Sequence, residues 1–268
     1  MFSDSHRSPA TRFRLFVWTL GGFLLLLAWD YSGFDLAMAA WFGSGNGFAL
    51  DKHWLLRGML HDDIKLLPWL VELALLVACV RPFGALKQLN FARRLQLALT
   101  TLATLLVVSA IKIHSYTSCP WDLRQFGGVA SHVSHWAWGV ADGGTGGCFP
   151  AGHALSGFAF VGGFFAFRPV RPKIAWRWFA ASMLAGFILG MAQQMRGAHY
   201  MSHTLWTAWI CWTVSALIDL AVSRMIARNS SRVRAPARVR SAPTPSMPAV
   251  SHGRRRRTAP TRPARRCP

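Results

Sequence analysis

Six long apolar runs, separated by short polar gaps, limit most strongly what this chain can fold into. Each run is close to the length, about 17 to 25 residues, that a helix needs to cross a hydrocarbon core of roughly 30 Å. A soluble core does not require such runs, so the pattern predicts an all-α polytopic membrane protein built as a six-transmembrane helix bundle. The predicted spans lie near residues 15–32, 64–80, 93–111, 153–168, 174–192 and 203–222.

The distribution of Lys and Arg predicts the orientation of these spans. If they alternate across the bilayer, 24 of the 30 Lys and Arg residues fall on one side and six on the other. Cytoplasmic loops and tails carry the excess of these residues. We therefore expect a multi-pass protein of the bacterial inner membrane with both termini in the cytoplasm. Loops 33–63, 112–152 and 193–202 then face outward, toward the periplasm.

The charged ends of the chain differ in composition from its middle. Residues 1–14 are predicted to be a cytoplasmic segment, and residues 15–222 form the membrane domain. Residues 223–268 are rich in Arg and Pro, contain no acid, and account for most of the net charge of +20. Such a segment cannot bury a core, so we expect a disordered cytoplasmic tail. Its expected partner is anionic lipid headgroups rather than nucleic acid.

Two of the five cysteines, Cys119 and Cys148, share one predicted outer loop. An oxidising compartment allows such a pair to form a disulfide, although sequence alone does not show that the two residues approach each other. We predict a Cys119–Cys148 disulfide. Cys79 and Cys211 are interpreted as small buried hydrophobic residues of the spans, and Cys267 lies in the tail.

The outer loops also collect fixed cations and imidazoles. This combination suits a phosphate ester, because cations neutralise the oxyanions, one imidazole attacks phosphorus and another protonates the leaving oxygen. His153 opens an apolar helix after Pro150, where unpaired backbone N–H groups favour an anion and Gly152 allows it to approach closely. The candidate residues are Lys112, Arg124, Arg196, Gly152, His153, His199 and His203.

Simpler interpretations exist for the same residue types. Lys112 and Arg196 would also serve as anchors at span ends. His199 and His203, four residues apart, would also suit zinc, but "HYMSH" lacks a glutamate after its first histidine, so no metal and no other cofactor is expected. The remaining loop histidines are interpreted as interface residues with their polar tips in water: His61, His114, His132 and His135.

Three motifs at these residues resemble the phosphatidic acid phosphatase type 2 superfamily, which is related to vanadium haloperoxidases and bacterial acid phosphatases. The family motifs are K-x6-R-P, P-S-G-H and S-R-x5-H-x3-D. The chain has Lys112-x6-Cys119-Pro120, then Pro150-Ala151-Gly152-His153, then a third segment around His199. The resemblance covers roughly residues 15–222. Cys119 replaces the motif arginine, and Ala151 replaces the motif serine.

The third motif can be aligned in two ways. In the alignment that we favour, "GAHYMSH" matches the family form G-x-H-Y-P-S-D, so His199 is the nucleophile and His203 stands at the position of the orienting aspartate. The motif arginine then falls on Gln193, with Arg196 one helical turn further on. In the alternative, His203 is the nucleophile, Arg196 is the motif arginine and Thr207 takes the aspartate position.

The resemblance implies a metal-independent membrane phosphatase acting on a lipid phosphate or diphosphate at the outer face. By this analogy His199 attacks phosphorus to form a phosphohistidine, and His153 protonates the leaving oxygen and then activates water. Lys112 and Arg196, with Arg124 replacing the charge absent at Cys119, would hold the phosphate oxygens. Two alternatives remain open: a phosphotransferase that passes the phosphoryl group to another lipid, and a non-catalytic binder or transporter of lipid phosphates.

Overall fold

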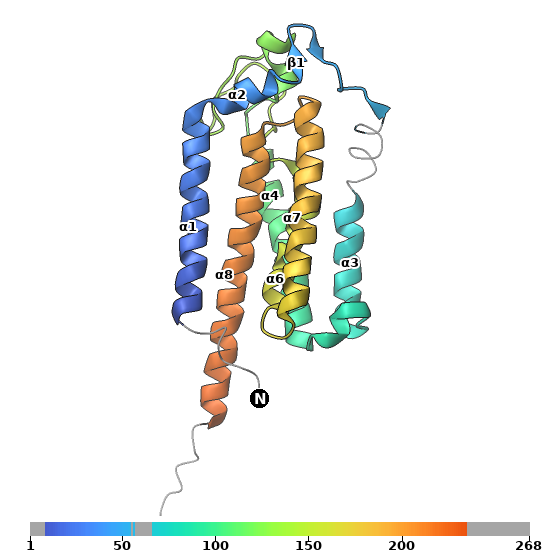
Figure 1. Cartoon of the computed structure of the whole chain (residues 1–268), viewed down its shortest axis with the longest axis vertical. Coiled ribbons are helices and arrows are strands. Elements are labelled where there is room, and N and C mark those ends of the chain that lie inside the picture. Colours follow the sequence, from blue (N-terminus) through green and yellow to red (C-terminus); the bar gives the residue numbers. More distant parts are fainter. Residues whose placement is uncertain (1–8, 55, 57–65, 235–268) are drawn as a thin grey trace, which may run out of the picture. The chain divides into compact units, whose positions relative to one another are not determined.

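The predicted bundle of apolar helices is confirmed. The computed structural model describes residues 9–54, 56 and 66–234, and in that part five helical segments are long and apolar enough to cross a membrane. Figure 1 shows that α1, α3, α7 and α8 run along a common axis. Large apolar side chains on these helices, such as Trp18, Leu73 and Leu184, are exposed, as expected for surfaces that face lipid tails. The five segments are Pro9–Ser32, Leu67–Gln88, Phe91–Ile113, Pro172–Met195 and Met201–Ile226.

Short elements connect and cap these helices. The strands β1 and β2 form a small antiparallel hairpin in which Gly43 pairs with Phe48. In chain order the elements are α1 (Pro9–Ser32), α2 (Phe34–Ala39), β1 (Gly43–Ser44), β2 (Gly47–Phe48), α3 (Leu67–Val80), η4 (Gly84–Gln88), α4 (Phe91–Ile113), η5 (Pro120–Asp122), η6 (Arg124–Phe126), α5 (Gly152–Phe158), η7 (Ala159–Val161), α6 (Gly162–Phe167), α7 (Pro172–Met195) and α8 (Met201–Arg234).

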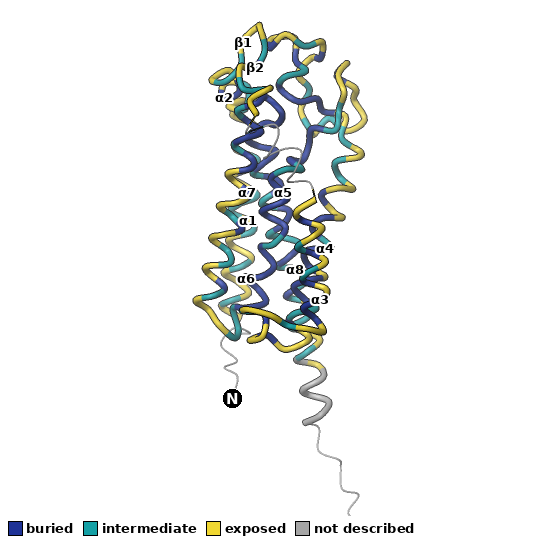
Figure 2. The backbone as a smooth tube through the Cα atoms, turned by 90° about the vertical axis from the view of Figure 1, so that its right-hand side faces the viewer, coloured by how far each residue is buried: buried dark blue, intermediate teal, exposed yellow. Residues whose placement is uncertain are grey.

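The fourth predicted span, 153–168, differs from the others. Its residues form three consecutive helical pieces, α5, η7 and α6, and the apolar run Gly152–Phe167 is shorter than the five long segments. This run is almost entirely buried, as the dark tube of α5 and α6 in Figure 2 shows. A Cβ on Gly157 would lie 2.2 Å from the backbone N of Gly186 in α7. The absence of side chains here lets α5 and α7 pack backbone against backbone.

We expect Gly157→Ala to destabilise the bundle, because the new methyl group meets the backbone of Gly186, which has no rotamer with which to yield. Overpacking of this kind typically costs about 1–3 kcal/mol. The measurement is the melting temperature of the purified protein in detergent micelles. Gly21→Ala is the matched control, since a Cβ on this glycine of α1 meets nothing within 4 Å. Equal melting temperatures for the two variants would contradict the close packing of α5 on α7.

The ends of the membrane domain differ from the predicted boundaries. Helix α1 begins at Pro9, six residues before the predicted span, and α8 continues to Arg234 instead of ending near 222. Residues 223–234, predicted to be disordered, are therefore helical, and the apolar side chains of Val222, Met225 and Ile226 continue the helical spacing. Residues 235–268, with Cys267, lie outside the described residues, as do residues 1–8 and His61.

Three tryptophans of α8 fasten it to α1. The Nε1 atoms of Trp209 and Trp212 donate to the carbonyl and the hydroxyl of Thr19, each at 2.9 Å. Near the C-terminal end of α1, Trp206 Nε1 donates to the Asp30 carboxylate at 2.9 Å. Buried indole N–H groups need an acceptor, so these bonds fix α1 against α8 and hold Asp30 close to the beginning of α8.

Candidate functional site

Three separate segments bring the predicted histidines together. His153 lies in the first turn of α5, His199 in the turn between α7 and α8, and His203 in the first turn of α8. The His199 ring centroid is 6.1 Å from that of His153 and 6.1 Å from that of His203. His199 and His203 are buried, with 4% and 1% of their surface exposed, and His153 is half-buried. His199 therefore lies between the other two rings.

Gly197 shapes the turn that carries His199. Its φ is +76°, a conformation that L side chains rarely adopt. A Cβ at this position would also lie 2.4 Å from the ring of Phe48 in β2. The glycine lets α7 reverse into α8 within a few residues, which places His199 one turn before His203.

A disulfide joins Cys119 to Cys148, with their Cα atoms 5.2 Å apart. The Cys148 carbonyl accepts a hydrogen bond from His203 Nδ1 at 3.1 Å, and Cys148 Sγ lies 3.5 Å from His199 Nδ1. Because a carbonyl only accepts, His203 carries its proton on Nδ1 and a lone pair on Nε2. The disulfide thus joins Cys119, in the first motif, to Cys148, which contacts both His199 and His203 of the third motif.

The same atoms form the one cluster with metal-ligand spacing in the described part of the chain. The sulfur atoms of Cys119 and Cys148 and a ring nitrogen of His199 lie within 4.8 Å of one another. Zinc takes cysteine as the thiolate, and a disulfide offers none. The oxidised site therefore does not fit a bound metal.

The surroundings of His199 keep its ring neutral. Burial lowers the pKa of His199 well below its usual value of 6.5, and the positive charge of Lys112 lowers it further, as would a proton on His203 or His153. A neutral imidazole has a free electron pair on one nitrogen. His199 is thus available as a nucleophile at neutral pH without a separate base.

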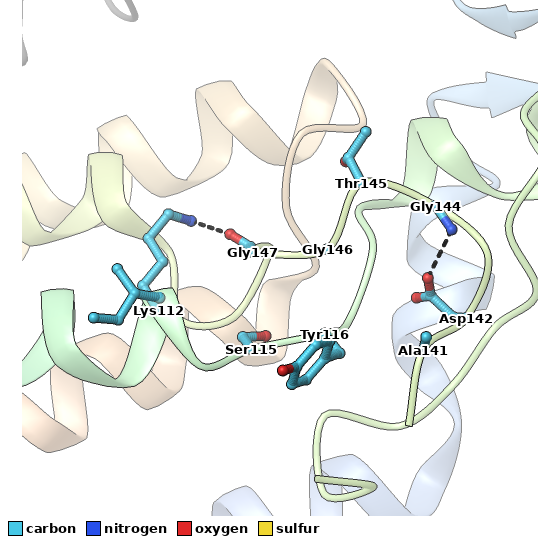
Figure 3. A pocket seen from close by; sticks show the side chains of 10 residues that line it. Lys112, Ser115, Tyr116, Ala141, Asp142, Gly144, Thr145, Gly146 and Gly147 are labelled. Atoms are coloured by element: carbon cyan, nitrogen blue, oxygen red, sulfur yellow. Dashed lines mark hydrogen bonds between the residues drawn. The ribbon is translucent and has the colours of Figure 1, made fainter. Parts of the chain in front are cut away.

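Lys112 ends α4 beside the start of α5. Its Nζ donates to the carbonyl of Gly147 and, at 3.4 Å, to that of Pro150. A Cβ on Gly152 would meet Lys112 Cε at 3.6 Å, so the lysine passes close to the glycine that precedes His153. Figure 3 shows the amine directed at Gly147 on the wall of a pocket of about 310 Å³, lined by Lys112, Ile113, Ser115, Tyr116, Ala141, Asp142 and Gly144–Gly147. Lys112 therefore places a cation on the wall of this pocket and close to Gly152, whereas none of the described histidines lines the pocket.

Asp142 holds the glycine-rich loop that forms this pocket. Its carboxylate accepts from the backbone N and the hydroxyl of Ser118, at 2.6 and 2.7 Å, and from Gly144 N at 3.0 Å. The last of these bonds is drawn in Figure 3. These hydrogen bonds connect the glycine-rich loop to Ser118, the residue before Cys119.

Arg196 lies at the C-terminal end of α7 and is 3% exposed. Its Nη1 donates to Gln193 Oε1 at 3.0 Å, its Nε donates to the Asp51 carbonyl at 3.0 Å, and its guanidinium lies 5.6 Å from the Trp121 ring centroid. Gln193 stands where the favoured alignment puts the motif arginine. Arg196 thus binds the side chain at that position, while its Nη2 forms an ion pair with Asp51 Oδ1 at 3.5 Å.

Other residues singled out in the sequence lie elsewhere. Arg124 is exposed, donates from Nε to the Val129 carbonyl at 3.1 Å, and has no hydrogen bond or ion pair with the histidines among the described residues. The predicted role of Arg124 at the phosphate therefore has no support in its position. The hydroxyl of Thr207, the aspartate position of the alternative alignment, bonds the carbonyls of Ala151 and His203 and not the His203 ring.

Sequence reasoning missed two residues of this region. His135, interpreted as an interface histidine, is packed between Phe149, whose ring centroid lies 4.3 Å away, and His203, at 5.5 Å. Asp30, inside the first predicted span, lies 3.4 Å from His135 Nε2. An acid inside a span usually faces the interior of the bundle, and that signal was present at Asp30. The loop around His135 gave no comparable sign.

Comparison with known proteins finds a family for half of the chain. The model of the PAP2 superfamily matches residues 93–226, from α4 into α8. This range includes Lys112, His153 and His199, whereas α1, α2 and α3 lie before it, so the match is shorter than the range 15–222 expected from the motifs. No curated protein and no solved structure matches the chain.

Proposed function

The chain belongs to the PAP2 superfamily, whose members are generally phosphatases, and on that premise we propose that it is a membrane phosphatase acting on a lipid phosphate or diphosphate. The reaction runs through a phosphohistidine intermediate. The observation that carries this proposal is the pairing of His153 with a buried, neutral His199, whose ring centroids are 6.1 Å apart. At this spacing, a single phosphoryl group fits between the two imidazole rings.

In the proposed first step His199 attacks phosphorus through Nε2, because its Nδ1 is turned toward Cys148. The N–P bond forms as the bond from phosphorus to the leaving oxygen breaks, and His153 gives that oxygen a proton. In the second step His153 takes a proton from water, the hydroxide attacks phosphorus, and the N–P bond breaks to release inorganic phosphate. Two cations, Lys112 and Arg196, stabilise the charge on the phosphate oxygens.

The ring contacts favour His199 over His203 as the nucleophile. The ring of His199 contacts that of His153, the proposed acid, at a centroid distance of 6.1 Å, whereas the ring of His203 contacts that of His199. His203 Nδ1 is bonded to the Cys148 carbonyl, and its ring packs against Phe149 and Tyr200. The first alignment of the third motif is therefore the one that we adopt.

The proposal includes an orientation in the bacterial inner membrane. The buried run Gly152–Phe167 is the sixth membrane segment, shielded from lipid by its neighbours, so that both termini face the cytoplasm. The excess of Lys and Arg in the termini and in segments 81–94 and 168–177 supports this orientation. The histidines then lie at the periplasmic end of the bundle, where a lipid phosphate at the membrane surface reaches them.

Phosphate release by the purified protein tests the function. We expect release from at least one of undecaprenyl diphosphate, phosphatidic acid and phosphatidylglycerol phosphate, with no loss of rate in EDTA, because the proposed steps use no metal. Acid-labile label should remain on the protein after reaction with substrate labelled in the phosphoryl group, as a phosphohistidine requires. Binding of these lipids without release would identify a non-catalytic binder. Transfer of label to a second lipid without free phosphate would identify a phosphotransferase.

A further inference from the structure

A row of imidazole rings leads from the proposed site to a buried carboxylate. The ring centroids of His199 and His203 are 6.1 Å apart, and those of His203 and His135 are 5.5 Å apart. His135 Nε2 lies 3.4 Å from Asp30 Oδ2, with the two side chains only 7% and 8% exposed. We call Asp30, His135, His203 and His199 the histidine row.

The proposed chemistry requires a negative charge near His199 that the third motif does not supply. A phosphorylated imidazole carries a positive charge, and the family motif places an aspartate four residues after the nucleophile. His203 occupies that position here. A neutral imidazole accepts or donates a hydrogen bond, but it lacks the charge that stabilises an imidazolium.

The Asp30 carboxylate is surrounded by hydrogen-bond donors rather than by fixed cations. Its Oδ2 accepts from Trp136 Nε1 at 3.0 Å and from Trp206 Nε1 at 2.9 Å, and indole donors stabilise an anion without cancelling its charge. No Lys or Arg among the described residues forms an ion pair with it. Its charge is therefore directed at His135, the neighbouring member of the row.

A small cavity lies along the row. It has a volume of about 90 Å³ and is lined in part by Asp30, His135 and His203. Asp30 Oδ1 is buried and has no hydrogen-bond partner among the described residues. The cavity has both polar and apolar residues in its lining, and its volume is enough for about three waters at roughly 30 Å³ each. Water there would connect the carboxylate with the Nε2 lone pair that His203 retains.

We propose that Asp30, acting through His135 and His203, is a positioning residue that supplies the counter-charge of the missing motif aspartate to His199. The inference rests on the proposed function, and it adds to it a residue from α1, outside the matched residues 93–226. The carboxylate reaches the site from a distant part of the chain instead of from the motif itself.

Asp35 provides the matched control. This carboxylate lies in α2, near the same end of the bundle, and lines the same cavity. Its Oδ1 accepts from Trp29 Nε1 at 2.9 Å and from Ser202 N at 3.0 Å. Asp35 has no ion pair with a ring of the histidine row among the described residues, so its loss removes a half-buried carboxylate and two hydrogen bonds without interrupting the row.

The test is a double-mutant cycle between Asp30 and His203, read as kcat and KM for the best substrate. We expect Asp30→Asn to lower kcat about tenfold with KM unchanged, the size of a charge effect transmitted across two rings, and Asp30→Glu to restore part of it. His203→Asp puts a carboxylate where the motif has one. In the His203→Asp protein, Asp30→Asn should lower kcat by less than twofold. Asp35→Asn should lower kcat by the same factor in the wild-type and in the His203→Asp protein.

Each outcome decides between the alternatives. Equal losses from Asp30→Asn with and without His203→Asp overturn the inference, and they show that Asp30 only anchors α1. If His203→Asp does not fold, the affinities of Asp30→Asn for orthovanadate and for inorganic phosphate replace the cycle. Weaker binding of orthovanadate with unchanged binding of phosphate supports the inference. Unchanged binding of both anions overturns it. A wild-type protein that releases no phosphate from any lipid fails the proposed function itself, whereas an active wild type with an equally active Asp30→Asn fails only this inference.

Discussion

Replacing His199 with asparagine is expected to abolish phosphate release, with kcat falling by at least about a thousandfold. The amide keeps the approximate size of the ring but has no nucleophilic nitrogen, so no N–P bond forms. His203→Asn should lose only about tenfold, because His203 donates to the Cys148 carbonyl and contacts the nucleophile without attacking phosphorus. The measurement is steady-state phosphate release together with trapping of label on the protein.

His132→Asn is the control for both variants. His132 lies at the same end of the bundle, packs against the ring of Tyr200 and has no ring contact with His153 or His199 among the described residues. We expect it to retain wild-type turnover and labelling. A reversed order, in which His203→Asn is inactive and His199→Asn is active and labelled, would make His203 the nucleophile and restore the alternative alignment of the third motif.

Replacing Lys112 with methionine is expected to lower kcat/KM by about 100- to 1,000-fold, the usual cost of removing one group that stabilises transition-state charge. The same change should alter the pH dependence. The charge of Lys112 lowers the pKa of His199, so its removal raises that pKa toward 6.5, although burial still holds it below. Since His199 must be neutral to attack, the variant should lose activity at a higher pH than the wild type as the solution is acidified.

The pH profile of kcat/KM checks this prediction. Lys87→Met is the control, because Lys87 is an exposed lysine of η4, which precedes the N-terminal end of α4, whereas Lys112 lies in the last turn of that helix. It should leave both the rate and the acidic limb of the profile unchanged. If the activity of Lys112→Met falls at the same acidic pH as that of the wild type, Lys112 does not act on His199.

Local patterns in the sequence were sufficient for the helices and for the centre of the site. The apolar runs mark the long helices because a helix that crosses the hydrocarbon core must be long and apolar. Both properties can be recognised in each segment of sequence by itself. The runs did not show that the one beginning at Gly152 is divided into α5, η7 and α6, because a continuous apolar run looks the same whether or not the helix is interrupted. Lys112, His153 and His199 were found because each lies in a motif of fixed spacing.

The supporting residues of the site were harder to predict. Trp136 and Trp206 reach Asp30 across 106 and 176 residues of sequence, and no local spacing records such contacts. Residue type alone suggested a phosphate-binding role for Arg124, yet the structure leaves its side chain exposed on the loop. Charge and residue type identify candidates, but only the fold decides which of them come together.

The attachment of α1 to α8 has a practical consequence for deletion experiments. A protein trimmed to residues 93–226 would retain the whole stretch that the family model matches, yet it would lack Asp30 and the hydroxyl and carbonyl of Thr19 that hold the tryptophans of α8. The stretch by which the family is recognised is therefore shorter than the smallest piece that can be expected to work, and a minimal version of this protein has to retain its first helix.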